Sequence, residues 1–166
     1  MSGKTIGTVF NHGFAGSYAR QPNMTINTKP NTGSVVIPYG APVMQNGVGV
    51  KFPDNTLTAA NFVGIASRQI QTPDSFLTQN GGGEYQVNDA VPVFQQGRIN
   101  VFCADGTPAM YGDVYVRIVA NGSKHVGDFE CTSDVGNNIK LDNCQWGGPK
   151  DANGVAELVI FTGIGA

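Results

Sequence analysis

Tight-turn signals recur along this 166-residue chain and constrain its fold more than any other feature. Asn-Gly pairs occur at 46–47, 80–81, 121–122 and 153–154, and Asp105-Gly106 adds a further reversal. These dipeptides favour the positive φ angles of hairpin turns. The chain has 23 Gly and 15 Asn but only three Glu, so residues that promote helices are scarce. We therefore expect an all-β fold with short strands and Gly/Asn-rich turns.

Short apolar segments lie between the turn signals, at the spacing typical of a β-barrel or β-sandwich. We expect a single domain over residues 35–166, built as one small barrel or sandwich, and the sequence leaves that choice open. A turn is expected at Gln95–Gly97, between two strongly patterned segments. The expected strands cover 35–37, 43–45, 48–50, 62–70, 85–87, 91–94, 98–103, 114–119, 126–131, 139–141 and 155–161.

The first 34 residues are predicted to form an N-terminal arm, irregular or extended. Phe10, Phe14 and Tyr18 recur at a helical spacing of four, but Gly13 and Gly16 interrupt them, so a regular helix is not expected. These aromatic side chains either pack on the domain itself or contact another chain. We take Phe10, Phe14, Tyr18 and Arg20 as the candidate partner-binding residues.

Charge is distributed unevenly, although the net charge is only −2. Residues 1–53 carry four basic and no acidic residues, whereas the remainder carries six basic and 12 acidic residues. This asymmetry is either chance in a weakly charged chain or a sign that the first segment meets an acidic neighbour. Arg20, Lys29 and Lys51, with nearby aromatics, fit nucleic acid only loosely, and the acidic remainder argues against direct nucleic-acid binding.

No segment indicates a membrane span or an export signal. Apolar runs stay well below the ~20 residues that a bilayer requires. The start of the chain lacks the apolar stretch of a secretory signal, so we expect the protein to act where it is made.

The sequence offers little support for catalysis, a cofactor or a metal. His12 and His125 are the only histidines, and no GxSxG nucleophile motif occurs. Cys103, Cys131 and Cys144 lack the paired spacing of zinc ligands, even with His125 added, and buried reduced thiols are the expectation. The carboxylates weighed as catalytic pairs and interpreted as ordinary turn residues are Asp105, Asp113, Asp128 and Glu130. We expect no enzyme activity, cofactor or metal.

A series of short motifs resembles the structural cement, or head decoration, proteins of tailed bacteriophages. The series spans most of the chain in the family's order. It comprises Gly13-Phe-Ala-Gly-Ser-Tyr-Ala-Arg20, Tyr39-Gly-Ala-Pro-Val43, Phe62-Val-Gly-Ile-Ala66, Val91-Pro-Val-Phe-Gln-Gln-Gly97, Gly112-Asp-Val-Tyr-Val-Arg117 and Asp151-Ala-Asn-Gly-Val-Ala-Glu-Leu158.

The resemblance implies a non-catalytic role on a virion. Copies would dock on the outside of the expanded capsid, bridge neighbouring major capsid proteins and resist the pressure of the packaged DNA. It also implies synthesis in the host bacterial cytoplasm. For the oligomer we expect a closed homotrimer in preference to a dimer.

A carbohydrate-binding β-sandwich of a phage tail or surface protein is the alternative. Such modules present aromatic platforms to sugars, and the candidates are Trp146, Tyr111 and Tyr85. A hydrolase is a third hypothesis, with no motif to support it.

Overall fold

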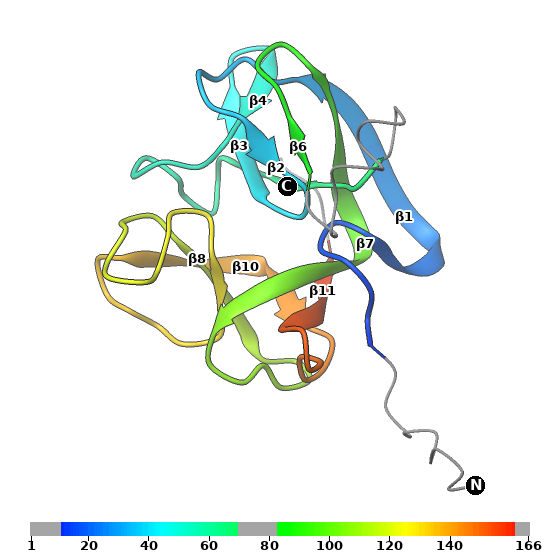
Figure 1. Ribbon diagram of the computed structural model, residues 1–166, viewed down its shortest axis with the longest axis vertical. Helices are drawn as coiled ribbons and strands as arrows, with labels where there is room; N and C mark the ends of the chain where they lie inside the picture. Colours follow the sequence, from blue (N-terminus) through cyan, green and yellow to red (C-terminus); the bar gives the residue numbers. More distant parts are fainter. Residues whose placement is uncertain (1–10, 70–82, 162–166) are drawn as a thin grey trace, which may run out of the picture.

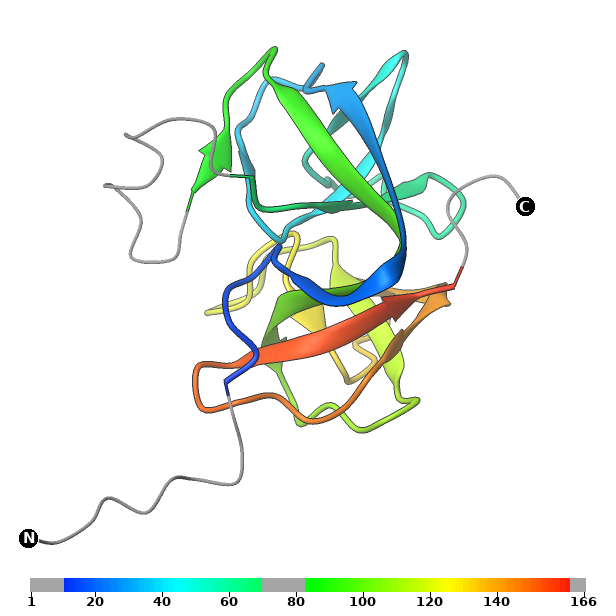
Figure 2. The same cartoon turned by 90° about the vertical axis from the view of Figure 1, so that its right-hand side faces the viewer.

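The all-β prediction is confirmed by a computed structural model that describes residues 11–69 and 83–161. Within these residues no helix is present, and hence none that could cross a membrane. Figures 1 and 2 show an N-terminal half stacked on a C-terminal half. The strands are β1 (Tyr18–Pro30), β2 (Ile37–Pro38), β3 (Pro42–Asn46), β4 (Gly49–Lys51), β5 (Phe62–Ala66), β6 (Glu84–Tyr85), β7 (Ala90–Asp105), β8 (Asp113–Arg117), β9 (Phe129–Glu130), β10 (Asn138–Trp146) and β11 (Val155–Ile160).

Strand β7 passes through both halves without interruption (Figure 1). The turn predicted at Gln95–Gly97 is therefore wrong, because these residues lie inside a 16-residue strand. Gly97 has φ of 111°, and a Cβ there would lie 2.3 Å from the carbonyl oxygen of Asn23. The glycine thus permits β1 to approach β7 closely where the β1–β7 register shifts. Glycine, which marks turns elsewhere in the chain, marks a close contact between two strands at residue 97.

The C-terminal half is a closed barrel. Strands β11, β10, β8, β9 and β7 are hydrogen-bonded in that order, and β11 also pairs with β7 from Val155–Phe102 to Ile160–Gly97. This second pairing closes the ring, so the structure selects a barrel over a sandwich for this half. Ile99, Val101 and Leu158 are among its fully buried residues.

The N-terminal half is organised around the first part of β7. Strands β5, β3 and β4 follow one another on one side of β7, and β1 lies on the other side. A single bridge between Asn31 and Val50 links the end of β1 to β4. The larger core cluster extends from the barrel into this half through Phe62, Ile65 and Phe94, so the two halves share it. A second, smaller cluster, which includes Val43 and Tyr85, lies within the N-terminal half.

The predicted hairpin at Asn46-Gly47 is confirmed, with a small shift. Asn46 pairs with Gly49, so Gly47 and Val48 form the turn between β3 and β4. Gly47 has φ of 58°, which is the left-handed conformation that this turn requires.

Much of the predicted N-terminal arm is extended, because Tyr18–Pro30 form β1. β1 begins at Tyr18 and is hydrogen-bonded to β7 as far as the Pro30–Ala90 pair. A domain boundary at residue 35 stays a prediction, although β1 precedes it and belongs to the sheet.

Gly64 offers a test of how closely β5 must approach β7. Its φ is 153°, and a Cβ would lie 2.3 Å from the Phe94 carbonyl oxygen. We expect Gly64→Ala to lower the free energy of unfolding by about 2–3 kcal/mol, because a backbone atom cannot yield as a side chain can. Urea denaturation, followed by the fluorescence of the buried Trp146, measures this change.

Gly148→Ala is the matched control. No heavy atom lies within 4 Å of its added Cβ, and its φ is not positive. We expect a change within about 0.5 kcal/mol. Equal stabilities for the two variants would contradict the close approach of β5 and β7.

Candidate partner-binding surface

The segment before β1 is docked on β7. The Gly16 amide donates to the Asn100 carbonyl at 2.7 Å, and the Asn100 amide donates to the Ser17 carbonyl at 2.9 Å. The Asn100 side-chain Nδ2 also donates to the His12 carbonyl at 2.7 Å. From His12 onward the chain therefore lies against the domain, which fixes the side chains that it presents.

Two glycines allow this docking. A Cβ on Gly16 would lie 2.8 Å from the Gly40 amide nitrogen and 2.9 Å from that of Arg68. A Cβ on Gly40 would lie 2.7 Å from the Cβ of Ala15. The motifs at residues 13–20 and 39–43 therefore meet in space, and their glycines are required by backbone packing.

The four predicted contact residues have different environments. Phe10 lies outside the described residues. Phe14 is 51% exposed, and the Arg68 guanidinium lies 4.4 Å from its ring centroid. Tyr18 stacks on Phe94 with a centroid distance of 5.9 Å and packs against the core. Tyr18 thus anchors the segment, whereas Phe14 and Arg20 reach the surface.

Arg20 and Arg98 hold one carboxylate between them. Arg20 Nε donates to Glu157 Oε2 at 3.0 Å, and Arg98 Nη1 donates to Glu157 Oε1. Burial alone would raise the pKa of Glu157, but the hydrogen bonds from Arg98 and Arg20 outweigh it and hold that pKa below its usual value. Two cations and one anion leave one positive charge, and 69% of the Arg20 side chain is exposed.

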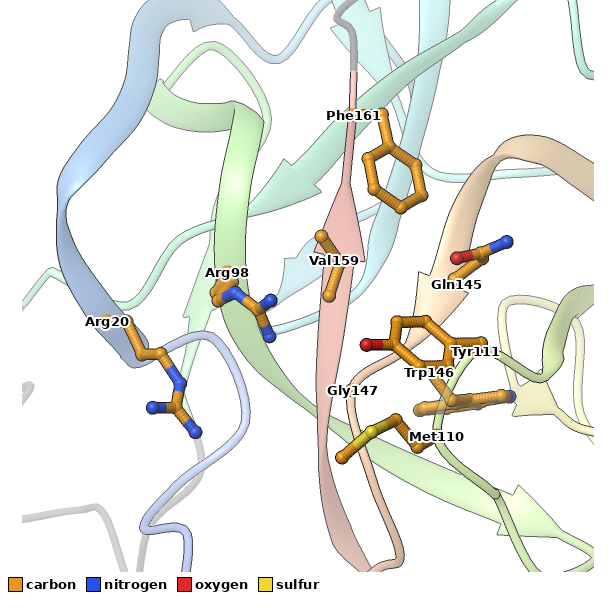
Figure 3. A pocket seen from close by; sticks show the side chains of 9 residues that line it. All are labelled: Arg20, Arg98, Met110, Tyr111, Gln145, Trp146, Gly147, Val159 and Phe161. Carbon is orange, nitrogen blue, oxygen red and sulfur yellow. The ribbon is translucent and has the colours of Figure 1, made fainter.

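A groove runs along β11 beside the triad of Arg20, Arg98 and Glu157 (Figure 3). The two arginines lie on one side of β11, and Met110 and Tyr111 lie on the other. Met110, Tyr111 and Phe161 are large apolar or aromatic side chains with exposures of 61%, 73% and 50%. The groove thus combines a net positive charge with exposed apolar area, a combination common in protein interfaces.

The carboxylates considered as catalytic pairs are each held by a cation or a main-chain amide, and Asp105 and Glu130 share Lys124, at 2.8 and 3.7 Å. Glu130 and Arg117 form a bidentate ion pair, at 2.7 and 2.9 Å, with both side chains fully buried. Asp105 pairs with Lys124, Asp113 with Lys140, and Asp128 accepts from the His125 amide. Within residues 11–69 and 83–161 no group of three His, Cys, Asp or Glu side chains is arranged to hold a metal.

The aromatic platform considered for sugars is not assembled. Trp146 is fully buried in the barrel core, and Tyr85 is 3% exposed and donates its hydroxyl to the Ser67 carbonyl. Only Tyr111 of the three candidates is exposed. The carbohydrate-binding alternative is therefore not favoured, because two of its three proposed platform residues are buried.

The comparisons with known proteins identify the family. The family described as structural cement protein (E217 gp24/Pam3 gp6) matches residues 3–161. The chain belongs to this structural cement protein family. A comparison with curated protein sequences gave no match.

A solved structure shares the fold of this cement-family chain. It is described as the capsid of Myoviridae phage XM1, with a TM-score of 0.67 and 17% sequence identity. The alignment covers 97% of the cement-family chain and 98% of the phage XM1 chain. At this identity the likeness establishes the shared fold.

Arg98 and Glu157 of the triad were not singled out by the sequence analysis. Glu157 is one of only three glutamates and lies in an otherwise apolar strand, which was the available signal. Their pairing follows from the β11–β7 register, in which Glu157 is opposite Asn100 and Val159 is opposite Arg98, so that Glu157 and Arg98 are diagonal neighbours on one face.

Glu157→Gln tests the electrostatic role of the triad through pH. Because the folded protein holds the Glu157 pKa below its usual value of 4.5, the ionised carboxylate stabilises the fold above that pH. This contribution is lost as the pH falls through the lowered pKa. We expect Glu157→Gln to be less stable by about 1–2 kcal/mol at pH 7 and to lose less stability upon acidification.

Urea denaturation between pH 7 and about pH 3 measures both effects. Asp142→Asn, at an exposed position of β10, is the control and should keep the wild-type pH dependence. If the free energy of unfolding of Glu157→Gln changed with pH as that of the wild type does, the arginines would not be stabilising the ionised carboxylate.

Proposed function

We propose that this protein decorates the outside of a phage capsid and cements neighbouring major capsid proteins, stabilising the expanded head. The observation that carries the proposal is the match to the structural cement family over residues 3–161. The shared fold with a chain from the phage XM1 capsid supports it. The protein then acts by binding at many equivalent positions of a lattice, where weak contacts add through avidity.

The groove beside Arg20 is the surface that we assign to the capsid contact. Its net positive charge favours an acidic segment of the major capsid protein. Met110, Tyr111 and Phe161 supply apolar area next to that charge. Phe14 extends the contact from the docked N-terminal segment.

Binding without catalysis is part of the same proposal. The buried carboxylate Glu130 is held by Arg117, and Glu157 is held by two arginines. Neither is placed to exchange a proton with a substrate, because Glu130 is fully buried and both oxygens of Glu157 are held by arginines. We place the protein in the virion, after synthesis in the host bacterial cytoplasm.

Arg20→Ala tests the capsid contact. We expect about tenfold weaker binding to expanded shells that lack the protein, because Arg20 is the most exposed charge of the triad. Co-sedimentation over a range of protein concentrations measures the affinity. Circular dichroism and urea denaturation establish that the variant is folded.

Lys29→Ala is the matched control, since it removes an exposed cation from the same strand. It should bind as the wild type does. Equal binding by Arg20→Ala and Lys29→Ala would overturn the assignment of the groove. Failure of the wild-type protein to bind expanded shells would overturn the capsid role itself.

We also propose that the protein forms a closed homo-oligomer, with a trimer preferred to a dimer. β1 is hydrogen-bonded to β7 along one edge, and among the described residues its other edge has no strand partner. The Asn31–Val50 bridge lies just past the C-terminal end of β1. An unpaired edge can accept a strand from another molecule. Antiparallel β1–β1 pairing would be twofold and give a dimer, whereas a trimer requires β1 to meet a different surface.

Light scattering coupled to size-exclusion chromatography measures this oligomeric state. We expect the mass of a trimer, three times 17.4 kDa, across a tenfold range of loading concentration. A monomer at every concentration would contradict a preformed oligomer, and a dimer would favour the β1–β1 contact.

A further inference from the structure

Two of the three cysteines meet at one backbone carbonyl. The Cys103 and Cys131 thiols each donate to the Asp105 carbonyl oxygen, at 3.3 Å in both cases. The two thiols thus share one acceptor oxygen. Cys144, in contrast, is buried beside Asn143 and takes no part in this cluster.

The surrounding backbone keeps the two sulfurs together. Gly106 has φ of 81°, and a Cβ on it would lie 2.2 Å from the Cys131 sulfur. The missing Cβ therefore leaves the space that this sulfur occupies. The Cys131 amide donates to the same Asp105 carbonyl at 3.2 Å, which ties the segment after β9 to the end of β7.

The pair lies at one of the two barrel seams with the fewest residue pairs, because β9 is short and pairs with β7 and with β8 through two residue pairs each. β9 pairs with β7 through only two residue pairs, Cys103–Phe129 and Asp105–Glu130, with a register shift between them. On its other edge β7 pairs with β11 through six residue pairs. A covalent link at the β7–β9 seam would therefore reinforce a place where the closed ring has few main-chain contacts.

We propose that Cys103 and Cys131 form a redox-controlled disulfide that staples β7 to the segment after β9. The oxidant is a small-molecule disulfide, for which oxidised glutathione is the probe. The half-buried Cys131 reacts first as the thiolate and displaces one glutathione, giving a mixed disulfide. The Cys103 sulfur then attacks the Cys131 sulfur and displaces the second glutathione. Two protein thiols and one glutathione disulfide thus become one protein disulfide and two glutathione thiols.

The environment makes this a switch with a slow second step. Burial first, and then the neighbouring Cys131, raise the pKa of the Cys103 thiol to about 11. Because the thiolate is the nucleophile, this raised pKa slows the attack of Cys103 on the mixed disulfide, so the cross-link forms only on sustained exposure to an oxidant. In the reducing cytosol the pair stays reduced. The cross-link itself does not depend on the proposed capsid location.

Intact mass spectrometry of the native protein incubated with oxidised glutathione tests the proposal. We expect the loss of two hydrogen masses without a lasting glutathione adduct, and peptide mapping should join Cys103 to Cys131. The cross-linked form should melt at a temperature higher by about 5 °C or more, and added dithiothreitol should reverse the shift.

Two variants make the result specific. Cys144→Ala leaves the pair intact and should still form the cross-link. Cys131→Ser should form none and should show no change in melting temperature with oxidant. A stable glutathione adduct on Cys131 without the internal bond, or two thiols that stay unreactive in the folded wild type, would overturn the proposal.

Discussion

The structure depends on the main-chain hydrogen bonds along both edges of β7. In the N-terminal half this strand pairs with β1 and β5, and in the C-terminal half it pairs with β11 and β9. A strand that is bonded on both sides cannot move in one half without disturbing the other, because each displaced amide and carbonyl would lose its partner. β7 therefore makes the two halves one mechanical unit, which suits a protein that we propose to hold neighbouring subunits against pressure.

Close backbone contacts explain the glycines that carry the family resemblance. Gly16 meets Gly40, Gly64 meets the Phe94 carbonyl, and Gly97 meets the Asn23 carbonyl. In each case a side chain would occupy space that another backbone segment already fills. These motifs consequently report on how the strands are assembled, and they carry little information on what the surface binds. The contact residues have to be sought at exposed positions such as Arg20, Met110 and Tyr111.

The two arginine–glutamate clusters have different consequences. Arg117 and Glu130 are fully buried, so their pairing avoids the large cost of an isolated buried charge and favours one arrangement of β8 and β9. Arg20 and Arg98 hold Glu157 near the surface and leave a positive charge exposed. The first cluster stabilises the fold, whereas the second gives the groove a charge that a partner can recognise.

Local residue preferences were sufficient to predict the all-β class, the hairpin after β3 and the turn before β11, because Asn-Gly pairs favour positive φ wherever they occur. They were insufficient for Gln95–Gly97, where the same glycine signal comes from contact with a distant strand. The closed barrel, the burial of Trp146 and the meeting of Arg20 with Glu157 follow from the pairing of distant strands, and Arg20 and Glu157 are 137 positions apart in the chain. The sequence by itself determined where the chain reverses and which segments are apolar. Only the tertiary structure decided which strands pair and which side chains share a surface, since those outcomes depend on the simultaneous packing of residues that are far apart in the chain.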